Sequence, residues 1–178
     1  LSKAGETLDA LNDKSYELAD GMIAVCDESG VLGLGGIVGG TSTGVAAETV
    51  DVFLECAYFD PLRIARTGRA LGVGSDARYR FERGIDPAFT VEAVELATQM
   101  IIDLCGGEAG SVVQAGSVPV CTKTIAYNPD HYTKLIGVEV EAAEQKRILE
   151  SLGFVVDAAW NVTTPSWRPD VFGQADLV

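Results

Sequence analysis

The feature that most constrains the fold is a series of short apolar runs, separated by turn residues, in the first third of the chain. Residues 22–26 (MIAVC) and 31–37 (VLGLGGI) predict two strands, and the sequence DESG between them is typical of a hairpin turn. A glycine-rich loop follows at 38–45, and residues 51–59 (DVFLECAYF) predict a further strand. None of these runs is long enough to span a bilayer.

Helix signals follow the strand signals. Asp60-Pro61 begins one predicted helix, which Gly72 ends. Asp86-Pro87 begins a second, in which apolar residues recur at helical spacing until Gly106-Gly107. Residues 1–116 therefore predict an α+β module with a mixed sheet and flanking helices.

The pattern changes after about residue 114. A short strand at 122–127 precedes helices at 129–136 and 141–152, each closed by a glycine, and a hairpin at 154–157 and 160–164. Strand, helix, helix and hairpin is the order of a winged helix-turn-helix. We therefore expect a winged-helix-like α+β domain over residues 117–178. Since the chain begins at Leu1 and stops within a pattern, we expect a fragment that is truncated at both ends.

Charge and cysteine usage narrow the possible functions. The net charge is −13, which argues against a surface that grips nucleic acid unaided. Six arginines nevertheless cluster in residues 63–83. They either pair with the excess of Asp and Glu within the chain, or bind phosphates and carboxylates through paired hydrogen bonds. The four cysteines form no CxxC pair and lie in or beside apolar stretches, which predicts reduced, buried thiols in a cytoplasmic protein.

Glu55 is the most informative single residue, because it is the only charge in the run from Val52 to Phe59. A carboxylate between apolar neighbours costs free energy unless it is paired. It is therefore either a structural acid, paired with an arginine or placed on an edge strand, or a functional acid in a pocket. The GIVGG sequence at 36–40 is either a tight turn or a place where backbone approaches a ligand.

Two further sites are less specific. Asp170 and Asp176 are either a pair that shares a hard cation or two solvated acids. His131 stands near a predicted helix start without a Ser or Cys partner motif, which favours a surface or capping role over catalysis.

Six motifs in fixed order carry a resemblance to a known family. They are GIVGG at 36–40, LECAYFDP at 54–61, SDARYRFERGIDP at 75–87, LIGVEV at 135–140, LESLGF at 149–154 and PSWRPD at 165–170. The first three resemble the editing, tRNA-binding module of bacterial phenylalanyl-tRNA synthetase beta subunits, and the last three resemble the start of the domain that follows it. The resemblance covers nearly the whole chain.

The resemblance implies a fragment of an enzyme that attaches phenylalanine to tRNA with ATP and Mg²⁺, and whose editing module hydrolyses mischarged tyrosine. It implies a cytoplasmic heterotetramer of two alpha and two beta subunits that binds the phenylalanine tRNA. Glu55 would accept the tyrosine hydroxyl, Gly39 would leave room, and Ser75 and Ala77 would line the pocket. No catalytic residue is assigned, and an activated water is the expected attacker.

The same resemblance places the family's pocket histidine upstream of Leu1, so we expect the isolated fragment to be inactive. Asp170 and Asp176 match two magnesium-binding positions of an incomplete site. The alternative functions are a winged-helix nucleic-acid binder and a free-standing tRNA-binding module without catalysis. Only four basic residues lie between 122 and 164, which argues against the nucleic-acid binder.

Overall fold

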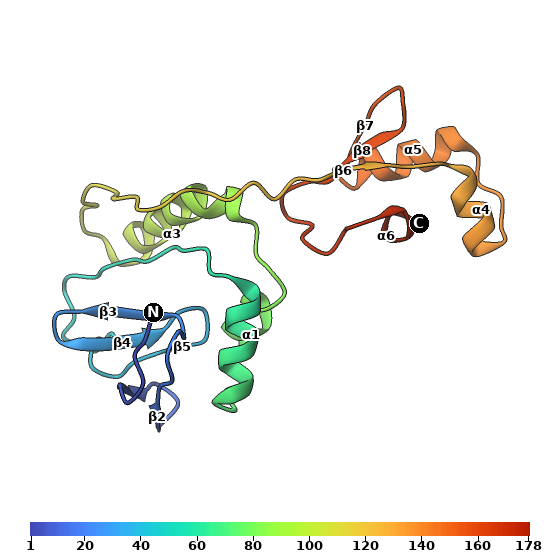
Figure 1. Ribbon diagram of the computed structural model, residues 1–178. Coiled ribbons are helices and arrows are strands. Elements are labelled where there is room, and N and C mark those ends of the chain that lie inside the picture. The colour runs from blue at the N-terminus through green and yellow to red at the C-terminus, as the bar shows by residue number, and fades with distance from the viewer. The chain divides into compact units, whose positions relative to one another are not determined.

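The computed structural model describes residues 1–178, which divide into two compact units (Figure 1). The first unit comprises Leu1–Ile85 and Val91–Ala109, and the second comprises Asp86–Thr90 and Gly110–Val178. Both combine helices with small sheets, so the predicted α+β class is confirmed. Every strand pair is antiparallel, where we expected a mixed sheet in the first half. The domain boundary at residues 116 and 117 stays a prediction.

Two small sheets build the first unit. Strands β1 (Thr7–Ala10) and β2 (Lys14–Glu17) form one hairpin, and β3 (Ala24–Asp27), β4 (Gly30–Leu34) and β5 (Val38–Gly39) form a three-stranded meander. The predicted hairpin of β3 and β4 is confirmed, and a bridge between the last residue of β1 and the residue after β5 joins the two sheets. We did not predict β1 and β2.

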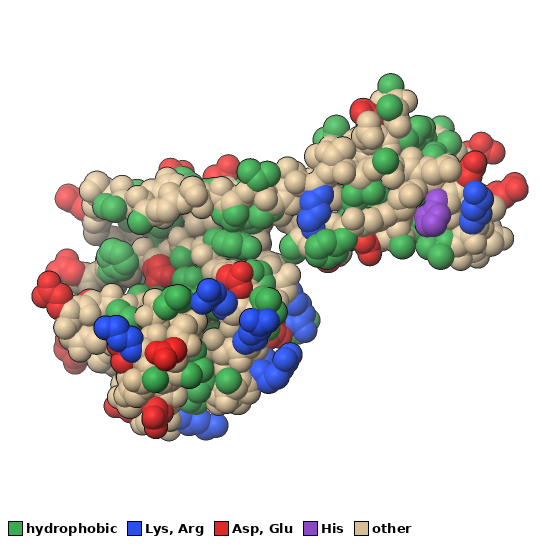
Figure 2. Space-filling view, in the orientation of Figure 1, with side chains coloured by type: hydrophobic (Ala, Val, Ile, Leu, Met, Phe, Trp, Pro, Cys, Tyr) green, Lys and Arg blue, Asp and Glu red, His purple; other side chains and the backbone are tan.

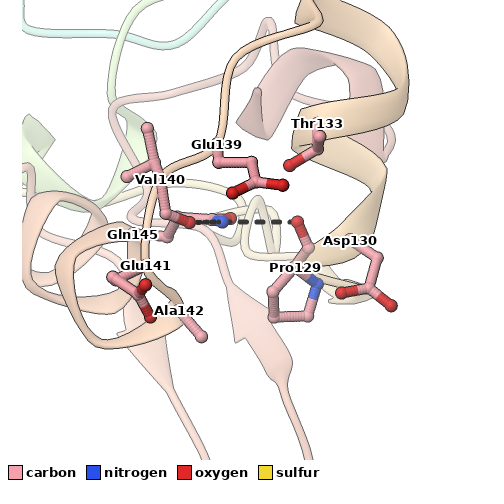
Figure 3. Close-up of a pocket in the computed structure, with 8 residues that line it drawn as sticks. All are labelled: Pro129, Asp130, Thr133, Glu139, Val140, Glu141, Ala142 and Gln145. Carbon is pink, nitrogen blue, oxygen red and sulfur yellow. Dashed lines mark hydrogen bonds between the residues drawn. The ribbon is translucent and has the colours of Figure 1, made fainter.

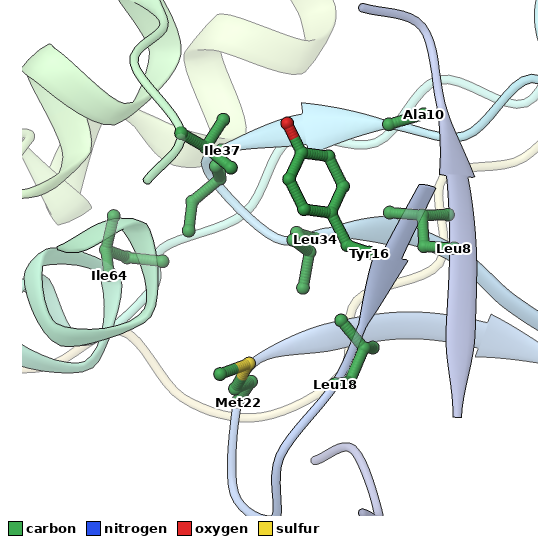
Figure 4. Close-up of a cluster of buried hydrophobic side chains, with 9 residues drawn as sticks. Leu8, Ala10, Tyr16, Leu18, Met22, Leu34, Ile37 and Ile64 are labelled. Atoms are coloured by element: carbon green, nitrogen blue, oxygen red, sulfur yellow. The ribbon is translucent and has the colours of Figure 1, made fainter. Parts of the chain in front are cut away.

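One hydrophobic cluster holds these sheets together (Figure 4). Alternate residues of β1, Leu8 and Ala10, are buried, as expected for a strand with one face on a core. Tyr16, Leu34 and Ile64 meet them from β2, β4 and the first helix. Ile64 is fully buried, so the helix is fixed to the sheets by its own side chain.

The predicted helix starts are confirmed. Helix α1 (Pro61–Ala70) begins where the Asp60 carboxylate accepts a 2.7 Å hydrogen bond from the Arg63 N–H, which satisfies one free donor of the first turn. The short η1 (Pro87–Phe89) and α3 (Thr90–Cys105) follow Asp86, which caps the Ala88 N–H. Helix α2 (Asp76–Phe81) was not predicted.

The strand predicted at 51–59 is wrong. These residues form no regular secondary structure, and no β-bridge joins them to another strand. Apolar alternation alone cannot make a strand, because a strand also needs a neighbour for its backbone groups. Phe53 is 93% exposed, and all residues from 51 to 56 are exposed in this chain, whereas Phe59 packs against the core.

The second unit has the predicted order of elements. Strand β6 (Thr124–Ala126) is followed by helices α4 (Asp130–Ile136) and α5 (Ala142–Ser151), the hairpin β7 (Val155–Val156) and β8 (Asn161–Thr163), and a short α6 (Gln174–Leu177). The sheet order is β6-β8-β7. Its core joins Ile125, Leu149, Phe154 and Val162. We did not predict α6.

No helix is long and apolar enough to cross a membrane. The four cysteines are free, but the prediction that they are buried is wrong, since Cys26, Cys56 and Cys105 are exposed and Cys121 is half-buried. Cys56 and Cys105 lie in exposed segments, at 51–56 and at the end of α3.

Candidate functional site

The three motifs of the first unit meet around one glycine. Gly36, with φ of +68°, lies against the rings of Phe59 and Phe81, so closely that a Cβ there would come within 2.9 Å of Phe81 and 3.2 Å of Phe59. The two rings in turn contact each other, with centroids 5.4 Å apart. Each of these three residues belongs to a different motif. The sequences GIVGG, LECAYFDP and SDARYRFERGIDP are therefore brought together by direct packing.

Ser75 adds a polar link between the same motifs. Its Oγ donates a 2.6 Å hydrogen bond to the Ile37 carbonyl and accepts a 3.0 Å bond from the Arg78 N–H. The residue thus caps the start of α2 and attaches this helix to the loop before Gly39. Ala77, in the first turn of α2, is half-buried beside it in sequence. Three of the four predicted pocket residues therefore lie on segments that contact each other.

A side chain at Gly39 would meet Leu11. The residue is exposed, but a Cβ at this position would lie 3.2 Å from the Leu11 side chain. Leu11 would have to move to admit even a methyl group, since contacts of this length are already repulsive. The space in front of Gly39 is consequently limited by a neighbour from the turn after β1.

Glu55 stands apart from the other predicted residues. It lies in the irregular segment at 51–59, it is exposed, and it forms no salt bridge with any of the arginines. Partial burial nevertheless raises the pKa of its carboxyl above the usual value of 4.5. The ion pair that was one alternative for this residue is therefore not formed.

Two open pockets lie elsewhere. One, of about 280 Å³, lies between α4 and α5, where the Gln145 amide donates to the carbonyls of Pro129 and Val140 (Figure 3). The other, of about 540 Å³, runs along α1 beside Arg63 and Arg66. Neither is lined by Gly39, Glu55, Ser75 or Ala77.

Asp170 and Asp176 do not make a metal site by themselves. Arg168 donates to both oxygens of Asp170, at 2.8 and 2.9 Å, and this pairing lowers the pKa of that carboxyl. One oxygen of Asp176 accepts the N–H groups of Phe172 and Gly173, which likewise lowers its pKa. No group of three acidic, histidine or cysteine side chains in the chain is placed to hold a metal ion. The magnesium site stays a prediction.

Comparisons with known proteins assign this fold to a family. Residues 1–106 match the model described as B3/4 domain, and residues 125–178 match the model described as tRNA synthetase B5 domain. Because the first model alone covers more than half of the residues, the chain belongs to the B3/4 domain family.

Similar curated proteins narrow the family to one enzyme subunit. The chain is 52% identical to the phenylalanine-tRNA ligase beta subunit of Novosphingobium aromaticivorans, over 99% of this chain and 22% of the relative. It is 51% identical to that of Cereibacter sphaeroides, over 99% and 22%, and 50% identical to that of Ruegeria pomeroyi, over 98% and 22%. The predicted resemblance to these aminoacyl-tRNA synthetase subunits is confirmed. The chain spans about a fifth of their length.

Sequence reasoning missed the residues that bring the motifs together. Phe59 and Phe81 read only as apolar positions, and their contact with Gly36 depends on the loop conformation. A signal for α2 was present, since Ser75 followed by Asp76 is a common helix start. The spacing of Arg63, Arg66 and Arg69 along one helix was also readable from the sequence.

Proposed function

We propose that this chain is the part of a phenylalanine-tRNA ligase beta subunit that removes tyrosine wrongly attached to the phenylalanine tRNA. The observation that carries the proposal is the packing of the three motifs around Gly36, Phe59 and Phe81. Motifs that are far apart in sequence and meet in space are expected of a site. Their resemblance to the editing module gives that site its chemistry.

The chemical problem explains why a second site is needed. A pocket built for phenylalanine rejects tyrosine poorly, because tyrosine only adds a hydroxyl, and discrimination of this kind reaches about 100-fold. A site that hydrogen-bonds the hydroxyl discriminates better, since phenylalanine would leave its buried polar groups unpaired. The proposed site therefore selects the tyrosyl ester for hydrolysis.

In this proposal Glu55 accepts the hydrogen bond of the tyrosine hydroxyl. Gly39 leaves room for the aminoacyl group, and Ser75 and Ala77 line the site at the start of α2. The exposure of 51–55 implies that these residues reach their working position against neighbours from the rest of the subunit. The isolated chain is accordingly expected to be inactive.

The hydrolysis itself needs no covalent intermediate. Water attacks the carbonyl carbon of the ester, the bond from that carbon to the ribose oxygen breaks, and the ribose oxygen leaves with a proton. No side chain of this chain is assigned as acid or base. The role of Glu55 is selection of the substrate.

The wider setting of this activity follows from the relatives. The complete protein is proposed to be cytoplasmic and to work with an alpha subunit, two of each, on the phenylalanine tRNA. ATP and Mg²⁺ serve the charging reaction of that complex. Asp170 and Asp176 are proposed to contribute to a magnesium site together with groups beyond this chain.

The experiment measures deacylation by the complete synthetase that contains this chain. The substrate is the phenylalanine tRNA, charged beforehand with either tyrosine or phenylalanine. The proposal predicts rapid release of tyrosine and slow release of phenylalanine. Binding of both tRNAs without release of either would instead support the alternative, a tRNA-binding module without catalysis.

A further inference from the structure

The 540 Å³ pocket beside α1 is lined entirely by residues of the first unit. One wall is a single face of the helix, whose lining residues follow the i, i+3, i+4, i+7 spacing: Arg63, Arg66, Thr67 and Ala70. The other wall is the segment at 20–22. Small-molecule sites enclose about 300–1,000 Å³, so this pocket has the size of a ligand site.

Arg63 connects the two walls. Its guanidinium donates a 3.1 Å hydrogen bond to the Gly21 carbonyl. A Cβ on Gly21 would lie 3.9 Å from the same nitrogen, so the guanidinium packs directly against the backbone of the segment at 20–22. Because this side chain is already engaged, it shapes the pocket and leaves the binding of a ligand to other groups.

Thr67 supplies the observation that points to a ligand. The residue is only 5% exposed, yet its hydroxyl has no hydrogen-bond partner in the chain. A common arrangement within a helix is that of Thr98 in α3, whose hydroxyl donates to the Val94 carbonyl at 2.7 Å. Every side-chain oxygen and nitrogen that is sealed from solvent has a partner, so the Thr67 hydroxyl opens into the pocket that the residue lines. It is therefore a polar group that a ligand can satisfy.

The pocket is lined by two acids and two bases: Asp20, Asp60, Arg63 and Arg66. Each acid gives one carboxylate oxygen to a backbone N–H and keeps the other free. Arg66 has neither an ion pair nor a hydrogen bond. Figure 2 shows Lys and Arg side chains over α1 with Asp and Glu side chains beside them. Since the charges cancel, the pocket favours a ligand with one ammonium and one anionic group over a purely anionic or cationic ligand.

The free charged groups are separated along the helix. Asp60 caps the start of α1, and Arg66 lies six residues later, which corresponds to about 9 Å along the axis at 1.5 Å per residue. A free amino acid carries both charges on one carbon atom, so it cannot contact both groups. Two extended residues span about 7 Å, so the charged ends of a dipeptide come near both.

The middle of a dipeptide also matches the pocket. Asp60 and Arg66 are exposed at the rim, whereas Thr67 and Met22 are buried. A ligand that reaches both rim groups therefore places its middle over a hydroxyl, which can donate and accept. An amide offers a donor and an acceptor in return, and Met22 provides apolar surface for an aliphatic side chain.

We propose that this pocket binds a short zwitterion with the chemistry of a dipeptide. The ammonium group binds the free oxygens of Asp20 and Asp60. The amide pairs with the Thr67 hydroxyl, and the carboxylate accepts two parallel hydrogen bonds from Arg66. No residue that lines the pocket belongs to the proposed editing site, so failure of one proposal leaves the other intact.

The test is a ligand-observed NMR titration of the 178-residue chain with glycyl-leucine. Three analogues each remove one feature: N-acetyl-glycyl-leucine lacks the ammonium group, glycyl-leucinamide lacks the carboxylate, and free leucine lacks the amide and the separation of charges. Glycyl-leucine is expected to bind with a Kd of about 1 mM, which is ordinary for a ligand of this size. Each analogue is expected to bind about 10-fold more weakly, because a hydrogen-bonded charge is lost or cannot reach its partner.

Two variants assign the contacts. Arg66→Gln is expected to weaken glycyl-leucine about 10-fold and to leave glycyl-leucinamide unchanged, since that analogue has no carboxylate for residue 66 to bind. Arg69→Gln is the control, because it removes the same charge from an exposed position of the same helix outside the pocket. Thr67→Val keeps the shape of the side chain and is expected to weaken binding about 5-fold. It should not lower stability in urea, since the hydroxyl has no partner within the chain.

Far-UV circular dichroism verifies that each variant folds. Four results would overturn the proposal: no saturable binding of glycyl-leucine, binding of free leucine or of either blocked dipeptide as tight as that of glycyl-leucine, equal weakening by Arg66→Gln and Arg69→Gln, or unchanged binding in Thr67→Val. The titration contains no tRNA, so its outcome is independent of deacylation.

Discussion

The side chain of Arg78 from α2 packs directly against Gly68 of α1, in the space that a side chain on residue 68 would occupy. A Cβ on Gly68 would overlap Nε and Cδ of Arg78. The arginine cannot move away freely, because it donates to Glu82 at 2.9 Å and to the Val73 carbonyl at 2.6 Å. The glycine therefore sets how closely α1 and α2 approach.

Gly68→Ala is expected to destabilise the first unit. Alanine favours a helix interior by about 1 kcal/mol over glycine. Displacing Arg78 forfeits hydrogen bonds of a charged group, which contribute about 1.5–3 kcal/mol each, so the loss exceeds the gain. The measurement is urea unfolding followed by far-UV circular dichroism. In an Arg78→Ala background the same change should stabilise by up to about 1 kcal/mol. The same sign in both backgrounds would refute the contact.

Gly36→Ala tests the meeting point of the three motifs. Gly72 offers a matched control, because its φ of +63° resembles the +68° of Gly36 but nothing lies within 4 Å of a Cβ there. Gly72→Ala should cost about 1–2 kcal/mol from backbone strain alone. Gly36→Ala should cost about 1–3 kcal/mol more, since the methyl group must also displace the phenylalanine rings. Equal losses in chemical denaturation would mean that the rings yield freely.

Tyr127→Phe probes the second unit. The Tyr127 hydroxyl donates a 2.6 Å hydrogen bond to the Gln145 side-chain oxygen, and both residues are buried. Removing the hydroxyl leaves a buried acceptor unpaired, at a cost of about 1–3 kcal/mol. Tyr132→Phe is the control, since its hydroxyl has no hydrogen-bond partner and should matter little. Both tryptophans lie in this unit, so their fluorescence in urea reports on it selectively. Similar losses for the two variants would contradict the pairing.

Acid should weaken the turn between β7 and β8. The Asn161 side chain and backbone, with the Ala159 N–H, donate to the Asp157 carboxylate and lower its pKa below 3.8. A lowered folded-state pKa gives stability that is present above the unfolded value and is lost as pH falls through the folded one. The wild type should therefore exceed Asp157→Asn in stability at neutral pH, and this excess should disappear on acidification below about pH 3.8. If the stability difference between the two proteins did not change with pH, the charged Asp157 carboxylate could not be its source.

Much of the fold could be predicted from local signals. The caps at Asp60 and Asp86, the turn after Asp27 and the closing Gly137 each fix a local conformation, and all four elements formed as expected. The strand at 51–59 failed for the opposite reason. Its existence depends on a partner strand, which alternation within the segment cannot supply.

The candidate site could be predicted only in part. Motif order assigned Gly39, Glu55, Ser75 and Ala77 to the site, an assignment that stays a prediction, and it did not give the contacts that bring their motifs together. The contact of Gly36 with Phe81 depends on a positive φ at the glycine and on packing against a ring 45 residues later in the sequence. Neither produces a periodic pattern in the sequence. Whether Arg66 and Arg69 form ion pairs likewise depends on the three-dimensional positions of the Asp and Glu side chains.

The central claim is that Glu55 selects tyrosine for hydrolysis, and it is tested most directly in the complete synthetase. Glu55→Ala removes an acceptor to which a hydrogen bond is worth about 1.5–3 kcal/mol. This corresponds to a loss of roughly 10- to 150-fold in the preference for the tyrosyl ester, at 1.4 kcal/mol per tenfold. Glu48→Ala removes the same charge from a neighbouring exposed position and serves as the control. Gly39→Trp should instead block hydrolysis of any aminoacyl ester by filling the site.

The measurement is the rate of deacylation of preformed tyrosyl-tRNA, read beside the rate of phenylalanine charging. Glu55→Ala should slow deacylation and leave charging unchanged, whereas Glu48→Ala should alter neither. Deacylation at the wild-type rate in Glu55→Ala, or charging that falls in parallel with it, would contradict the role assigned to Glu55.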